Sequence, residues 1–167
     1  STFFSGMSVY LLYQLLKPKT QKEFNLFGIL IGSTLVFHVY GFITTPDAPL
    51  LFFTILYLYS LKNFLEKNNF NFTILLAISF AGLVYSKYHG ILVILFTIFP
   101  IIKTWWRNPK FYAAVFLSLI LYTPHFIWLF QNDFIPIQYH FIDRSSDESF
   151  EFGKLFTYLL IFFLGAS

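Results

Sequence analysis

Two charged side chains stand in sequence that is otherwise apolar. Asp47 lies between two prolines in TTPDAPLLFF, and Lys87 lies in YSKYHG, next to Tyr88 and His89. An ionisable group in a long apolar segment is a candidate functional residue, and a lysine beside hydrogen-bonding side chains is suited to bind a phosphate. Two alternatives stay open. Asp47 could serve only the helix dipole at the start of a helix, and Lys87 could only extend its ammonium to a membrane surface.

A polar stretch near the carboxyl end, QNDFIPIQYHFIDRSSDESFEFGK at 131–154, holds two further candidates. His140 and Arg144 are four residues apart, so in a helix they would share one face. A salt bridge from Arg144 to a nearby aspartate is the simpler alternative. Apolar and polar residues interleave here, which predicts a segment that lies along a membrane surface without crossing it.

The sequence gives weak support for a metal site. There is no cysteine, and no two histidines have the i, i+4 spacing of ligands on one helix; they are His38, His89, His125 and His140. His125 follows Pro124 in an apolar segment and is expected to be a hydrogen-bonded histidine inside a helix bundle. We therefore assign no metal ligands, while a divalent ion held by residues that the fold assembles stays open. A glycine-rich phosphate loop is also absent, which disfavours soluble nucleotide chemistry.

The composition indicates the surroundings of these residues. Of the 167 residues, 57% are hydrophobic, 23% aromatic and 11% charged, and the mean hydropathy is +0.67. A soluble domain has about a quarter charged residues, so the chain is predicted to be an integral membrane protein. The net charge of +3 is small and unevenly distributed along the chain, so we expect no nucleic-acid partner.

Seven apolar segments are candidate membrane helices, because only helices satisfy the backbone of a short chain in lipid. They are 2–16, 24–43, 48–65, 71–86, 90–102, 111–130 and 155–167. The predicted fold is all-α, a polytopic transmembrane bundle of about six to seven helices, with residues 1–167 as part of one transmembrane domain. Residues 71–102 are expected to form two short helices, since one long helix would bury Lys87 midway.

Charge predicts the orientation of these helices. Eight of the eleven basic residues fall in alternate connections, around 17–22, 62–67 and 103–110. A basic excess marks the cytoplasmic face, so Asp47, the turn at Lys87 and the 131–154 stretch are expected to share the extracytoplasmic face. Trp105 and Trp106 beside Arg107 are typical of a cytoplasmic interface anchor. The chain begins at Ser1 and stops inside an apolar run, and we interpret it as an internal fragment of a larger protein.

Four motifs in order carry a family resemblance over roughly residues 5–160. They are TTPDAPLLFF at 44–53, AGLVYSKYHGILVIL at 81–95, Pro124 to Trp128 followed by Gln131 to Asp133, and Tyr139-His140 through Arg144. The chain resembles the polyprenyl-phosphate-sugar-dependent glycosyltransferases of the GT-C superfamily. Within it, the chain is similar to bacterial protein mannosyltransferase-like enzymes and the lipid A aminoarabinose and galacturonic acid transferases.

The resemblance implies a GT-C-like fold and transfer of a sugar from a polyprenyl-phosphate donor to a lipid, glycan or protein acceptor. The expected location is the bacterial inner membrane, with the active site on the extracytoplasmic face. Asp47 matches a second acidic position that supports the acceptor or a divalent metal, and Lys87, Tyr88, His89, His140 and Arg144 match clamps for the lipid phosphate and sugar. The family's first acidic loop, which supplies the catalytic base, would precede residue 1, so the fragment alone is expected to be inactive. A multi-spanning transporter and an inactive, lipid-binding remnant are the alternatives.

Overall fold

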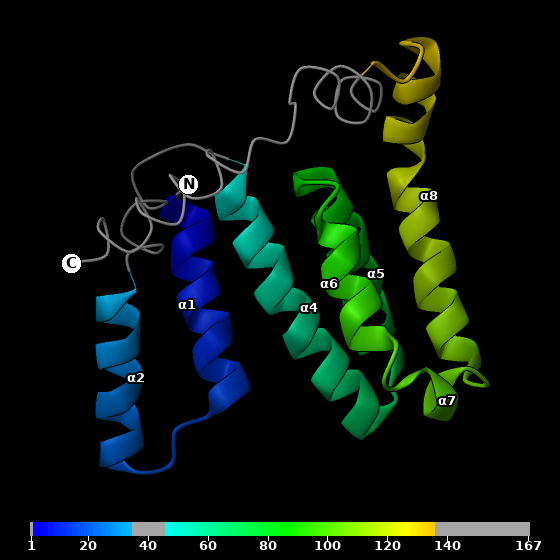
Figure 1. Ribbon diagram of the computed structural model, residues 1–167. Coiled ribbons are helices and arrows are strands. Elements are labelled where there is room, and N and C mark those ends of the chain that lie inside the picture. The colour runs from blue at the N-terminus through cyan, green and yellow to red at the C-terminus, as the bar shows by residue number, and fades with distance from the viewer. Residues whose placement is uncertain (1, 35–45, 136–167) are drawn as a thin grey trace, which may run out of the picture. The chain divides into compact units, whose positions relative to one another are not determined.

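The computed structural model describes residues 2–34 and 46–135, and every regular element in these ranges is a helix. The helices are α1 (Thr2–Leu16), α2 (Gln21–Ser33), α4 (Asp47–Lys67), α5 (Phe70–Ser86), α6 (Gly90–Ile98), α7 (Ile102–Trp105) and α8 (Pro109–Gln131) (Figure 1). The all-α prediction is confirmed for these residues. Residues up to Thr123 form one compact unit, and those from Pro124 onward form another. The assignment of residues 1–167 to a single domain stays a prediction.

Two of the described helices, α4 and α8, are long and apolar enough to cross a membrane. Helices α1 and α5 are apolar but shorter, with 15 and 17 residues. The polytopic bundle therefore stays a prediction, with α4 and α8 as candidate spans. Of the predicted segments, 24–43 continues past α2 into residues outside the described ranges, and 155–167 lies wholly outside them.

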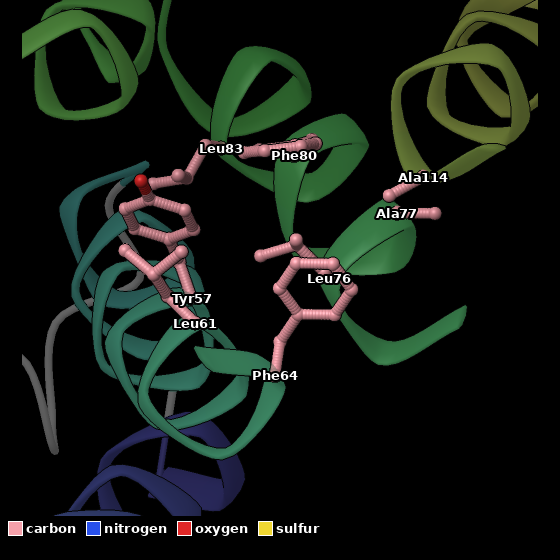
Figure 2. Packing of buried hydrophobic residues seen from close by; sticks show 8 residues of the cluster. All are labelled: Tyr57, Leu61, Phe64, Leu76, Ala77, Phe80, Leu83 and Ala114. Atoms are coloured by element: carbon pink, nitrogen blue, oxygen red, sulfur yellow. The ribbon is translucent and has the colours of Figure 1, made fainter. Parts of the chain in front are cut away.

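The core of the first unit lies where α4 packs along α5. Figure 2 shows the buried side chains of this cluster; they are Tyr57, Leu61, Phe64, Leu76, Ala77, Phe80, Leu83 and Ala114. The Tyr57 and Phe80 rings lie 5.5 Å apart, and the Tyr57 hydroxyl is 2.6 Å from the Thr97 hydroxyl of α6. Burying a tyrosine is tolerated where its hydroxyl has a partner, so this hydrogen bond ties α6 to the α4–α5 pair.

A glycine permits the close approach of α4 and α5 on the half nearer Asp47. A Cβ added to Gly82 would meet the Phe53 ring at 2.2 Å, so any larger residue would have to displace that ring. Phe53 in turn contacts the rings of Phe4 in α1 and of Phe52. The glycine of the motif AGLVYSKYHG therefore has a packing role.

The chain breaks between α5 and α6 at Lys87, Tyr88 and His89, which confirms the prediction of two helices there. The prediction that the second of them spans 90–102 is wrong: α6 ends at Ile98, and the short α7 begins at Ile102. Pro100 explains the difference, because it has no N–H to donate to a helix, although Phe99 before it keeps helical dihedral angles, φ −50° and ψ −47°.

Helix α2 begins three residues earlier than the apolar segment that predicts it. Thr20 and Glu23 form a capping box: the Thr20 hydroxyl accepts from the Glu23 N–H at 3.2 Å, and the Glu23 carboxylate accepts from the Thr20 N–H at 3.2 Å. The Lys19 N–H also donates to this carboxylate at 2.6 Å. These backbone hydrogen bonds lower the pKa of Glu23 below its ordinary value.

Two contacts gather the basic connections at one end of the first unit. Lys62 Nζ donates to the Leu15 carbonyl at 3.1 Å, which joins the ends of α1 and α4. Asn108 Nδ2 donates to Asn68 Oδ1 at 3.0 Å, which joins the end of α4 to the start of α8. Asp47 begins α4 and so lies at its opposite end. This is the grouping that the charges predict.

Candidate functional site

The proline-rich sequence around Asp47 sets the start of α4. Pro46 precedes the helix with helical dihedral angles, φ −61° and ψ −13°, and Pro49 falls in its first turn. Proline is tolerated at these positions because the first N–H groups of a helix have no intrahelical acceptor. Asp47 is thus the first helical residue, where the helix dipole favours a negative charge. The N-cap residue is Pro46, and it makes no side-chain capping hydrogen bond.

Lys87 lies directly after α5, in a turn that is held by the backbone. Its backbone is extended, with φ −156° and ψ 142°, and its N–H donates to the Leu83 carbonyl at 3.2 Å. The Gly90 N–H then donates back to the Lys87 carbonyl at 2.8 Å. A Cβ on Gly90 would lie 2.4 Å from the Leu83 carbonyl oxygen, which real side chains do not allow. The start of α6 therefore packs against the end of α5 only with glycine at this position.

The Asp47 carboxylate and the Lys87 ammonium form an ion pair. These residues are 40 positions apart, and their side chains retain 30% and 42% of their full exposure. An ion pair with this exposure contributes about 0–1 kcal/mol to stability. Stability alone is therefore a weak reason for two charges at the end of apolar helices. The pair also keeps the charged ammonium oriented while leaving it accessible.

The other predicted residues near the turn differ in exposure. Tyr88 is half-buried, and His89 is exposed at the amino end of α6, where its side chain makes no capping hydrogen bond. The structure therefore brings Asp47, Lys87, Tyr88 and His89 to one end of the α4–α5–α6 group. His140 and Arg144 lie outside the described residues, so their predicted role in phosphate binding stays a prediction.

Two tyrosines that sequence reasoning missed tie α8 to this turn. The Tyr85 and Tyr122 rings meet edge to face with centroids 5.0 Å apart, and the Tyr85 hydroxyl donates to the Leu121 carbonyl at 3.2 Å. Tyr85 is two residues before Lys87, so the contact helps to hold the end of α5 in place. Tyr85 stands inside the motif AGLVYSKYHG, whereas no sequence signal marks its partner Tyr122.

No three potential metal ligands gather within 2–34 and 46–135. His125 stacks on the Trp128 ring with centroids 5.6 Å apart, as a half-buried histidine within α8. Asp47 on its own is one carboxylate, whereas a divalent ion is held by several oxygen ligands.

The chemistry available at the pair follows from its two charges. The ammonium can exchange its carboxylate partner for a phosphate, which would leave the Asp47 carboxylate able to accept a proton or a hydrogen bond. Both groups are anchored by helix ends, so such an exchange would require side-chain motion alone.

The comparison with known proteins supports the family resemblance of the two motifs that contain Asp47 and Lys87. No curated protein and no solved structure matches the chain. The family model for dolichyl-phosphate-mannose-protein mannosyltransferases matches residues 1–128 of the 167, a range that includes both Asp47 and Lys87. The chain therefore belongs to the dolichyl-phosphate-mannose-protein mannosyltransferase family.

Proposed function

We propose that the chain is part of a membrane glycosyltransferase of the GT-C type. It transfers a sugar from a polyprenyl-phosphate donor to a lipid, glycan or protein acceptor, with the chemistry at the end of α4 that carries Asp47. Family membership supports the enzyme class. The observation that carries the assignment of the site is the Asp47–Lys87 ion pair, because it joins the two motif segments that are 40 residues apart in the sequence.

The donor's phosphate gives Lys87 a role. In a polyprenyl-phosphate sugar the phosphate is a diester with a single negative charge. During transfer the bond between sugar C1 and the phosphate oxygen breaks, the acceptor oxygen or nitrogen bonds to C1, and the phosphate leaves as a monoester with greater negative charge. An oriented ammonium stabilises that added charge more than the charge of the bound donor, which is the condition for accelerating the reaction.

Asp47 has a complementary role in this proposal. When Lys87 turns to the donor phosphate, the Asp47 carboxylate gains hydrogen-bonding capacity toward the acceptor, whose proton passes to a carboxylate as the new bond forms. The resemblance places the principal base in a loop before residue 1, so Asp47 orients the acceptor or holds a divalent metal beside it. The basic end of the unit then faces the cytoplasm, and Asp47 faces the extracytoplasmic side.

Binding of a short-chain polyprenyl phosphate without sugar tests the phosphate role of Lys87. A hydrogen bond to a charged group is worth about 1.5–3 kcal/mol, so Lys87→Gln is expected to weaken binding by about 10- to 150-fold. Lys87→Arg should retain much of the affinity, since it keeps the charge. Lys22→Gln, an exposed lysine at the other end of the unit, is the matched control and should bind as the wild type does.

If Lys87→Gln binds polyprenyl phosphate with unchanged affinity, Lys87 does not bind the donor phosphate. A sugar-transfer assay of the intact enzyme addresses the enzyme class separately, because a transporter would move the donor without releasing polyprenyl phosphate. Release of polyprenyl phosphate that depends on the acceptor supports the transferase, whereas transport of the donor without that release would overturn it.

A further inference from the structure

The net charge of the first unit lies entirely at one end. Up to Thr123 the chain carries nine lysine or arginine residues and three acidic residues. Lys87 and Asp47 neutralise each other at one end. The remaining eight cations and two carboxylates, Glu23 and Glu66, belong to the connections at the other end, where the net charge is +6. Glu23 is already engaged by the backbone N–H groups of Lys19 and Thr20.

One segment at this end combines cations with exposed apolar side chains. Between Phe99 and Lys110, the large apolar residues Phe99, Ile102 and Trp106 are 81%, 43% and 51% exposed. Lys103 and Arg107 alternate with them and are also exposed. We call residues 99–110 the aromatic–basic turn. A soluble surface seldom exposes such residues together, whereas the boundary between acyl chains and headgroups accommodates both kinds.

Contacts to the core hold the aromatic–basic turn in a defined position. The Trp105 ring lies 5.3 Å from the ring of Phe64, which is fully buried. Asn108 accepts from the Lys110 N–H at 3.0 Å and donates to Asn68, so it caps α8 and ties it to α4. The Arg107 guanidinium lies 5.1 Å from the Trp106 ring centroid, in cation–π geometry. The exposed cations are thus presented by anchored backbone.

We propose that the aromatic–basic turn is a binding surface for anionic phospholipid headgroups, with Lys103 and Arg107 contacting their phosphates and Trp106 at the level of the headgroups. The net charge of +6 at this end selects anionic over zwitterionic lipid, since only anionic lipid carries a compensating charge. The inference is independent of the sugar chemistry, which lies at the other end of α4.

Tryptophan quenching by brominated lipid tests the proposal in the full chain. The chain has three tryptophans, so Trp128→Phe leaves Trp105 and Trp106 as reporters at the turn. The protein is reconstituted in vesicles of phosphatidylcholine with increasing brominated phosphatidylglycerol, or with brominated phosphatidylcholine as the reference. Quenching should show several-fold preference for phosphatidylglycerol, and the preference should fall as salt is raised.

Charge variants at the turn give opposite, predictable shifts. Lys103→Gln with Arg107→Gln should reduce the preference, by up to about fivefold for each charge removed. Glu66→Gln removes a negative charge from the same end and should raise the preference for phosphatidylglycerol. Equal quenching by the two lipids in the wild type would overturn the proposal. So would a preference that is undiminished in the Lys103→Gln, Arg107→Gln variant, which would assign lipid selection to another part of the chain.

Discussion

Replacing Gly90 by alanine tests whether close packing between α5 and α6 sets the position of Lys87. The added Cβ would lie 2.4 Å from the Leu83 carbonyl oxygen and 2.7 Å from the carbonyl carbon, where ordinary contacts begin at 3.4 Å. Both atoms belong to the backbone, so no side-chain rotation relieves the clash. The start of α6 must therefore move by about 1 Å away from α5.

The expected cost follows from two opposing effects. Overpacking of this kind costs about 1–3 kcal/mol, and replacing glycine by alanine at a helix position returns up to about 1 kcal/mol. Gly90→Ala should therefore lower the free energy of unfolding by about 1–2 kcal/mol. A displacement of about 1 Å at the Lys87 turn should also reduce transfer by roughly 100-fold, since reacting groups lose their alignment.

Unfolding in detergent, followed by tryptophan fluorescence, measures the first effect for Gly90→Ala against a matched control. Gly28 of α2 has open space where its Cβ would lie, so Gly28→Ala should be neutral or stabilising. If Gly90→Ala proves as stable as Gly28→Ala and binds polyprenyl phosphate normally, the close contact does not position Lys87 and the reasoning fails.

Two further predictions concern packing and pH. Gly82→Ala should destabilise the α4–α5 pair by about 1–3 kcal/mol in detergent unfolding, because its Cβ would meet the Phe53 ring at 2.2 Å. Adding Phe53→Leu to the same chain should restore most of the lost stability. A loss that Phe53→Leu leaves unchanged would refute the contact. Glu23 has a lowered pKa in the folded chain, so its contribution is fully present above its ordinary value of about 4.3 and is lost as pH falls through the lower folded value. Protection of the amides at the start of α2, relative to their intrinsic exchange rates at each pH, should therefore fall only in acid, and Glu23→Gln should remove that pH dependence. An equal fall in both proteins would assign it to another group.

The sequence predicts where these helices begin and end better than it predicts which face of each helix packs against its neighbour. The apolar run from Ala48 requires a helix, and the lysine at position 87 is too costly midway through a span, so the break there follows from hydropathy and charge. Charge alternation also places Asp47 and Lys87 at the same end. Their pairing was not predictable, because hydropathy does not give the rotation of α4 about its axis relative to α5.

Local signals explain most of the remaining differences. The pattern Thr20-x-x-Glu23 is a capping box, so the earlier start of α2 was available from the sequence. Pro100, which has no N–H to donate, marks the end of α6 in the same way. The contact between Tyr85 and Tyr122 depends on the packing of α8 against α5, and no local pattern specifies it.

Exchange of the two charges tests the central claim, which is that Asp47 and Lys87 form a chemical site and not merely a structural ion pair. Transfer from a labelled polyprenyl-phosphate sugar is measured in the intact enzyme of which this chain is part, as the wild type and as the variant Asp47→Lys, Lys87→Asp, with detergent unfolding as the control. The exchanged pair can still form, so stability should change by no more than about 1 kcal/mol. Transfer should fall by at least about 100-fold, because the ammonium no longer lies where the phosphate leaves. Transfer at the wild-type rate in a stable exchanged variant would show that the two charges serve the fold alone.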